Sequence, residues 1–354
     1  MSEFAPTGTP VSDPGHALAR GPETKASAPR GTGRATASDP ESVRVWIRLV
    51  RPPLSLLGLA PTAATLALLW ANGAHLLAVP AFFSIVAVAL VLSGANLLDE
   101  YLEFERAERA SAVAGVLGPG EAGALLAAAG IAPLRALRAG IGLLIAGTLA
   151  GIPLVMSGGG SVALLGIGGL GVAFLYSSTS FALKRLPGGE GIVFLALGPG
   201  IAAAVALAQR SRVSGQVLLT GCALGLLALA LVEAVHLMSK ERDERLGLRT
   251  LVSYLGMRGS RLLYILCVIG AFVLLALVAL PKGAPHGALA VLLALPAALV
   301  ALTGMLRARN TTALALIPRQ TLRLYAFVAL WLVVGLLVSG VVARLVALLL
   351  GSGA

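Results

Sequence analysis

The sequence predicts an all-α polytopic membrane protein with nine transmembrane helices, and three observations support this. Of its 354 residues, 57% are hydrophobic and only 12% are charged. The mean hydropathy is +0.91, which is far above that of a soluble domain. Apolar runs close to the roughly 20 residues that cross a bilayer follow one another along the chain. Gly, Pro and charged residues interrupt these runs, so we expect separate spans rather than one buried core.

The nine candidate spans lie at residues 54–73, 76–98, 138–156, 160–179, 190–209, 215–238, 260–280, 286–306 and 322–348. Several contain an internal Pro, which a membrane helix tolerates where neighbouring helices satisfy the freed carbonyl groups. Gly-rich stretches such as residues 166–171 favour close approach between helices. Together the spans define one transmembrane domain over residues 44–350.

Residues 1–43 differ sharply from the rest of the chain. They are rich in Pro, Gly, Ser, Thr and Ala, with scattered charge. Such a segment buries too little apolar surface to offset the entropy lost on ordering, so we expect a disordered cytoplasmic tail. It lacks the apolar stretch of a signal peptide, and we expect no cleavage.

Positive charge predicts the orientation of the helices in the cell membrane. If the amino terminus is cytoplasmic, the 27 Lys and Arg residues fall at the cytoplasmic side with four exceptions, namely Arg210, Arg212, Lys282 and Arg344. This asymmetry follows the positive-inside rule. The ends of the second and sixth spans then share the cytoplasmic side.

The net charge of +11 does not indicate nucleic-acid binding. The basic residues lie between apolar runs and form no arm or face with interleaved aromatic residues. The two cysteines, Cys222 and Cys267, both lie inside apolar runs, so they predict neither a disulfide framework nor a cysteine metal site.

An acidic cluster follows the second apolar run. At 100° per residue, Asn96, Asp99, Glu100 and Glu103 fall within an arc of about 100° on one helix face. Glu105 points away from that face. The second span therefore carries one acidic stripe at its cytoplasmic end.

A second cluster follows the sixth apolar run. Glu233, His236, Lys240 and Asp243 fall within an arc of about 80°, with Ser239 at its margin. Glu233 lies inside the span, where an ionised side chain facing lipid is costly, so it should face the bundle interior or a wet cavity. His236 fits either a satisfied interior histidine or a substrate contact.

Two carboxylate stripes at equivalent helix ends suit a hard divalent cation. Mg²⁺ typically combines one or two carboxylates with substrate phosphates and water. The stripes thus predict a phosphorylated substrate with a membrane-soluble body. The alternative to a metal site is that the acids only mark the boundary between membrane and water. This alternative fits the acids that are interleaved with arginines, namely Glu105, Glu108, Glu241 and Glu244.

Four segments, in order, resemble motifs of one known family. The first is Arg48–Ser55, similar to an Arg-Pro-x-x-Leu-x-Ser pattern before the first span. The second, Asn96–Glu103, resembles Asn-x-x-(Asn/Asp)-Asp-x-x-Asp, with glutamates at its last two acidic positions. The third is Tyr176–Pro199, similar to Tyr-Ser-Gly-Gly-Pro…Gly-Glu…Phe…Gly. The fourth, Ser239–Leu251, resembles Asp-x-x-x-Asp-x-x-x-Gly-Lys-x-Thr-Leu, with Ser239 in place of the first aspartate.

Over about residues 44–345 the chain resembles the UbiA-type intramembrane aromatic prenyltransferases, and most closely the MenA-like 1,4-dihydroxy-2-naphthoate polyprenyltransferases. The resemblance implies nine helices around a central cavity that opens to the cytoplasm. It also implies a Mg²⁺-bound isoprenyl diphosphate whose allylic cation is attacked by an aromatic acceptor. Catalytic roles are implied for Asn96, Glu100, Glu103 and Asp243. Metal ligation is implied for Asp99, Glu100, Glu103 and Asp243. Substrate contacts are expected from Arg51, Tyr176, Lys184, Arg185, Glu233, His236, Ser239, Lys240 and Arg249.

Departures from the family pattern keep other functions open. Glu for Asp lengthens two ligands by a methylene, and Ser239 removes a formal charge. The alternatives are a different quinone, porphyrin or lipid acceptor, or a weakened isoprenoid-binding protein. A transporter is disfavoured, because the acids gather at one face and no inverted repeat is visible. No recognisable motif encodes the acceptor, the prenyl length or the oligomeric state.

Overall fold

The computed structural model describes residues 40–114, 126, 131–177, 188–245, 250–281 and 284–350, and within them the chain is all-helical. The amino-terminal half contains α1 (Pro40–Val50), α2 (Pro52–Ala71), α3 (Ala78–Ala114), α5 (Pro133–Ala150), α6 (Ile152–Ser177), α7 (Gly189–Leu195), η2 (Ala196–Gly200) and α8 (Ile201–Ala208). The carboxyl-terminal half contains α9 (Gly215–Arg245), α10 (Leu251–Ala279), η3 (His286–Ala294), α11 (Leu295–Arg307), α12 (Thr311–Leu314) and α13 (Ile317–Leu349).

Nine helical segments of the described residues are long and apolar enough to cross a membrane. This confirms the predicted number of spans. α7, η2 and α8 together form one span, as do η3 with α11 and α12 with α13. The protein is therefore an integral membrane protein.

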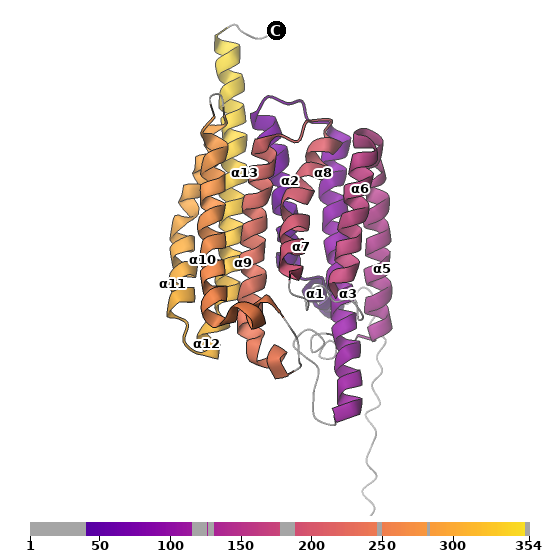
Figure 1. Cartoon of the computed structure of the whole chain (residues 1–354). Coiled ribbons are helices and arrows are strands. Elements are labelled where there is room, and N and C mark those ends of the chain that lie inside the picture. Colours follow the sequence, from indigo (N-terminus) through magenta and orange to yellow (C-terminus); the bar gives the residue numbers. More distant parts are fainter. Residues whose placement is uncertain are drawn as a thin grey trace, which may run out of the picture.

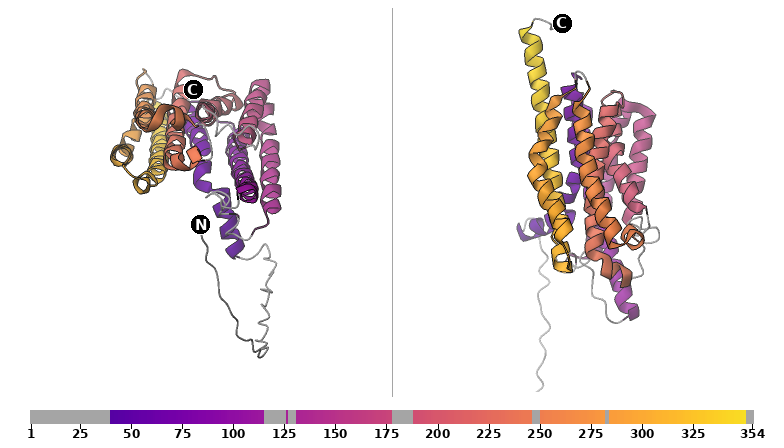
Figure 2. Two further views of the ribbon diagram at one scale, coloured as in Figure 1. Left: turned by 60° about the horizontal axis from the view of Figure 1, so that its bottom comes forward. Right: turned by 60° about the vertical axis from the view of Figure 1, so that its left-hand side comes forward.

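The helices form a bundle in which α2 is central. Figures 1 and 2 show α3, α5 and α6 on one flank and α9 to α13 on the other. α2 lies between the flanks and packs against α3, α8, α9 and α13. In the spans of α2 and α9, 67% of the most apolar window is buried, compared with 6% in the span of α6. α2 and α9 are thus the inner helices, and the apolar faces of the outer helices are left for lipid.

The main core joins these inner helices to the carboxyl-terminal flank. Its largest fully buried side chains include Leu68, Leu224, Leu275 and Tyr325. The Tyr325 hydroxyl donates a hydrogen bond of 3.0 Å to the Leu57 carbonyl, so α13 is fixed to α2 by a polar contact inside the apolar core.

A π-helical turn interrupts the span of α7 and α8. Pro199 lies within this turn, η2. Proline has no N–H, and its ring clashes with the carbonyl four residues earlier, so it disrupts the regular α-helical hydrogen bonds. Gly198 in the turn packs directly on Gly221 and Gly225 of α9. This close contact sets the position of α7 relative to α9.

Helix boundaries differ from the prediction at several places. The span predicted at 138–156 is helix α5, which ends at Ala150. α13 begins at Ile317 rather than 322. α3 and α9 continue past residues 98 and 238 to Ala114 and Arg245, because their charged extensions keep a helical pattern outside the apolar window. α1 begins at Pro40, within the predicted tail, and the rest of that tail lies outside the described residues.

The contact between η2 and α9 should be intolerant of added volume. A Cβ at position 198 would lie 2.7 Å from the Gly221 carbonyl oxygen and 2.8 Å from the Gly225 Cα, and backbone cannot yield easily. Gly198→Ala should therefore lower the free energy of unfolding by about 1–3 kcal/mol. A thermal-unfolding scan in detergent measures the effect. The control is Gly166→Ala on α6, where a Cβ meets open space. Equal midpoints for the two variants would contradict this account of the packing.

Candidate functional site

The polar ends of α3 and α9 lie at the same end of the bundle. In Figure 1 both helices run downward and extend below the neighbouring spans, and α1 lies at that same end. α2 packs against both α3 and α9. The prediction from span counting, that both clusters are on one side, is confirmed. We refer to this end, which carries residues 96–105 and 236–245, as the acidic end.

The junction between α1 and α2 is tied to the stripe on α3. The Asn96 side-chain amide donates a hydrogen bond of 2.8 Å to the Val50 carbonyl. Next in the chain, Arg51 adopts a left-handed conformation with φ of 53° and ψ of 61°. A non-glycine residue in this region carries strain that the surroundings must compensate. The polar contacts of Arg51 with α3 supply that compensation.

Arg51 neutralises part of the acidic stripe. Its Nη2 lies 2.5 Å from Glu100 Oε2, and its Nη1 lies 3.9 Å from Asp99 Oδ2. The Glu100 side chain is fully buried, and its Oε1 has no hydrogen-bond partner among the described residues. One oxygen of Glu100 is thus compensated by Arg51, and the other is buried near the Leu126 backbone without a hydrogen bond of normal geometry.

The remaining acids of α3 divide as the helical period predicts. Glu103 forms a 2.7 Å ion pair with Arg106 on the same helix. Glu105 accepts a hydrogen bond of 2.7 Å from the Tyr101 hydroxyl and pairs with Arg109 at 3.1 Å. The Arg109 side chain is 69% exposed, so the Glu105 pair is a surface pair. This fits the view that Glu105 marks the water boundary.

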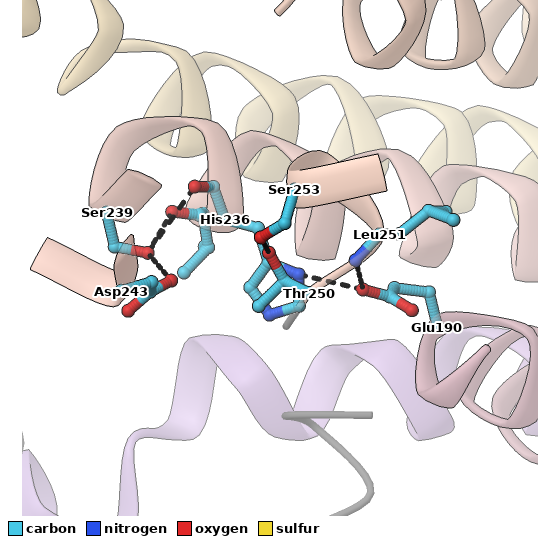
Figure 3. Close-up of polar contacts among 8 residues, drawn as sticks. Glu190, His236, Ser239, Asp243, Thr250, Leu251 and Ser253 are labelled. Atoms are coloured by element: carbon cyan, nitrogen blue, oxygen red, sulfur yellow. Dashed lines mark hydrogen bonds and ion pairs between the residues drawn. The ribbon is translucent and has the colours of Figure 1, made fainter. Parts of the chain in front are cut away.

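On α9, the predicted stripe is held by a local hydrogen bond. The Ser239 hydroxyl donates to Asp243 Oδ2 at 2.8 Å and approaches the Val235 carbonyl at 3.1 Å (Figure 3). Asp243 is buried. The Ser239 hydroxyl therefore helps to orient Asp243. Lys240 is partly buried on the same stretch of helix.

One turn deeper, His236 meets a carboxylate that was not among the predicted site residues. His236 Nδ1 lies 3.0 Å from Oε1 of Glu190, in the first turn of α7. The Leu251 backbone N–H donates to the same oxygen at 3.2 Å, and Figure 3 shows both contacts converging there. Glu190 thus links the starts of α7 and α10 to α9. Its sequence signal is that it is an isolated acid in an apolar span.

Glu233 completes a buried group of three. Its side chain has no exposed surface, and ligand-type atoms of Glu190, Glu233 and His236 lie within 4.8 Å of one another. Neither carboxylate oxygen of Glu233 has a hydrogen-bond partner among the described residues. The expectation that Glu233 faces the bundle interior is confirmed. We call these three residues the Glu–Glu–His cluster.

Some predicted site residues cannot be placed. Lys184, Arg185 and Arg249 lie outside the described residues. Tyr176 lies near the end of α6, but its side chain is outside the described part of the structure.

Oxygen donors at the acidic end match the preferences of a hard cation. The carboxylates of Asp99, Glu100 and Glu103 share one face of α3, and Asp243 ends the stripe on α9. The partnerless Oε1 of Glu100 is the kind of buried oxygen that a cation satisfies. Mg²⁺ therefore fits the residues that are present.

The model of the UbiA prenyltransferase family matches residues 59–317. The fold is similar to a UbiA homologue from Archaeoglobus fulgidus, with a TM-score of 0.55, 15% identity, and coverage of 83% of this chain and 98% of that chain. The same homologue bound to GPP and Mg²⁺ gives a TM-score of 0.52 at 14% identity, covering 81% and 99%. A digeranylgeranylglyceryl phosphate synthase gives 0.53 at 14% identity, covering 84% and 99%. No curated protein sequence matches.

The ion pairs of Arg51 should contribute to stability as well as to the site. In Arg51→Met, the fully buried Glu100 loses its cationic partner, so the free energy of unfolding should fall by up to about 3 kcal/mol. The double variant Arg51→Met/Glu100→Gln should recover part of this loss. Arg109→Met is the control, because its exposed pair with Glu105 contributes about 0–1 kcal/mol. Thermal unfolding compares the variants, and a larger loss in the control would reject the proposed role of Arg51.

Proposed function

Because the chain belongs to the UbiA prenyltransferase family, we propose that it transfers a polyprenyl chain from an isoprenyl diphosphate to an aromatic acceptor at the cytoplasmic face of the cell membrane. The family match over residues 59–317 makes it a membrane prenyltransferase. The single observation that carries the proposal is that two acidic stripes, on α3 and α9, lie at the same end of the bundle. The charge asymmetry of the loops supports the cytoplasmic orientation.

The proposed Mg²⁺ ligands are Asp99, Glu100, Glu103 and Asp243. Support comes from the chemistry of these donors and from structural neighbours, since the Archaeoglobus homologue binds GPP with Mg²⁺ and also DMAPP with Mg²⁺. When bound, Mg²⁺ would neutralise charge that develops on the leaving diphosphate. Asn96 would help to position α3 through its hydrogen bond to the Val50 carbonyl, and Ser239 would orient Asp243 through the hydrogen bond between their side chains.

Cationic side chains of the chain would complete the site. We assign Lys184, Arg185 and Arg249 to diphosphate contacts, since guanidinium and ammonium groups donate charge-assisted hydrogen bonds to phosphate oxygens. Arg51 contacts the stripe on α3, and Lys240 lies on the stripe of α9. Tyr176 is proposed to contact the substrate. His236 and Glu233, for which substrate contacts were also expected, belong to the Glu–Glu–His cluster, which lies deeper on α9 than Asp243.

In the proposed reaction, the bond between prenyl C1 and the diphosphate oxygen breaks and the diphosphate departs with the electron pair. A ring carbon of the acceptor forms the new bond to C1, and the ring then loses a proton. The residues of the chain hold the diphosphate, exclude water from the allylic cation and keep the acceptor in line. We propose 1,4-dihydroxy-2-naphthoate, as in menaquinone biosynthesis, as the first acceptor to test.

A lipid acceptor is the second candidate, because a structural neighbour is a digeranylgeranylglyceryl phosphate synthase. Turnover of a geranylgeranyl donor with geranylgeranylglyceryl phosphate, and none with dihydroxynaphthoate, would favour it. Tight Mg²⁺-dependent binding of a prenyl diphosphate without turnover on any acceptor would instead indicate an isoprenoid-binding protein. Flux of an ion into proteoliposomes without prenyl diphosphate would indicate a transporter.

Removing a charge from either stripe should slow transfer. Glu103→Gln and Asp243→Asn should each lower kcat/KM by about 100-fold or more, because each removes a charge that the leaving diphosphate and its cation need. The measurement is transfer of a radiolabelled prenyl chain in detergent or nanodiscs. Glu241→Gln is the matched control, an exposed acid on the same helix. Folded variants with the full rate would remove those residues from the mechanism.

Chelation supplies a separate check of the cofactor. Transfer should be lost when EDTA removes divalent ions and should return when Mg²⁺ is added in excess. Activity that persists in EDTA would contradict a role for Mg²⁺ while leaving the membership of the family untouched.

A further inference from the structure

The Glu–Glu–His cluster is separate from the proposed diphosphate site. His236 and Asp243 are seven positions apart, which corresponds to about 10 Å along α9. The cluster is also deeper in the bundle. Its side chains are almost fully enclosed, with exposures of 1% for Glu190, 0% for Glu233 and 8% for His236. The three side chains therefore have different surroundings from those of the proposed Mg²⁺ ligands.

The cluster contains more acceptor capacity than the protein satisfies. Both hydrogen-bond partners of Glu190, the His236 ring and the Leu251 backbone N–H, contact the same carboxylate oxygen, Oε1. The other oxygen of Glu190 and both oxygens of Glu233 have no hydrogen-bond partner among the described residues. The Ser260 hydroxyl lies close to Glu233 but outside hydrogen-bonding geometry. A carboxylate left in this state within a membrane span calls for a cation.

His236 alone does not supply that cation. As an imidazolium it would balance one carboxylate, and it already contacts Glu190. Glu233 would then have to stay protonated to avoid an uncompensated buried charge. A divalent ion would balance both carboxylates and accept a lone pair from neutral imidazole, so it accounts for all three side chains at once.

The spacing of the three residues matches a known class of metal site. Glu233 and His236 form a Glu-x-x-His pair, and three residues on a helix place both side chains on one face. Glu190 comes from the facing helix α7. In di-iron and di-manganese carboxylate bundles, each metal is held by a Glu from one helix and a Glu-x-x-His pair from another. The cluster has the composition of one half of such a site.

The distances also suit one ion. Ligands that are adjacent on a single ion, at bond lengths of about 2.1 Å, lie about 3 Å apart. His236 Nδ1 and Glu190 Oε1 are 3.0 Å apart. One ligand-type atom from each of Glu190, Glu233 and His236 lies within 4.8 Å of the other two, so binding of an ion would draw the three side chains slightly closer together.

The ligand set indicates the class of ion. Mg²⁺ usually keeps several water molecules and rarely occupies a protein cage, which fits the acidic end better than a closed interior. Imidazole with carboxylates favours ions such as Zn²⁺, Fe²⁺ or Mn²⁺. We propose that Glu190, Glu233 and His236 bind one divalent first-row transition-metal ion, which fastens α7 and the start of α10 to α9. This site does not depend on the proposed prenyl transfer.

The test measures metal content rather than activity. Full-length, untagged protein in detergent is stripped with chelator, incubated with Zn²⁺ in the presence of excess Mg²⁺, desalted and analysed by mass spectrometry for metals. About one Zn²⁺ per chain should be retained. Zn²⁺ should also raise the midpoint of thermal unfolding, because an ion that binds only the folded state stabilises it. The same experiment with Co²⁺ should give the visible absorption of a site with a nitrogen ligand.

Variants locate the ion. Glu233→Gln and His236→Gln should each reduce retained Zn²⁺ at least tenfold and abolish the thermal shift. Glu241→Gln should retain the ion, and so should Asp243→Asn even though it loses prenyl transfer. If a cluster variant does not fold, Glu190→Gln is measured in its place. Failure to retain Zn²⁺, or equal retention in all variants, would overturn the proposal. Loss of the ion in Asp243→Asn would show that the two sites are one.

Discussion

Carboxylates inside a membrane bundle must be compensated, and this requirement organises the polar half of the molecule. Glu100 is fully buried, and it is matched by Arg51 at the start of α2. Glu190 is buried, and it is matched by His236 and by the amino-terminal N–H of α10. Each compensation joins helices that are separate in the chain. The bundle is therefore fixed at its acidic end by polar pairs. Elsewhere it is held mainly by apolar packing around α2 and α9, with individual hydrogen bonds such as that from Tyr325 to the Leu57 carbonyl.

The two sites that we propose on helix α9 differ chemically because they lie at different depths in the bundle. Asp243, near the carboxyl end of α9, lies at the acidic end, where we propose that Mg²⁺ and the diphosphate bind. Two to three turns earlier, Glu233 and His236 are buried, and His236 contacts Glu190 of α7. The same helix face thus changes from a surface suited to hydrated Mg²⁺ to an interior suited to a dehydrated transition metal.

Packing of small residues makes this arrangement possible. Gly198 sits in a π-turn forced by Pro199 and contacts Gly221 and Gly225 of α9. The contact lets the backbones approach closely, so the side chain of Glu190, which lies about two helical turns before Gly198, reaches His236. A bulkier residue at any of these positions would separate α7 from α9 and open the Glu–Glu–His cluster.

The sequence by itself determined the number of spans, their approximate limits and the faces on which the acids lie, because these depend on local hydropathy and on the helical period. It predicted the stripe of Asn96, Asp99, Glu100 and Glu103 and the interior position of Glu233. Only the tertiary structure decided the pairing of Arg51 with Glu100 and of Glu190 with His236, which are separated by 49 and 46 residues. Partners at such distances are chosen by how the helices pack, and helix packing depends on many side chains at once rather than on any local pattern.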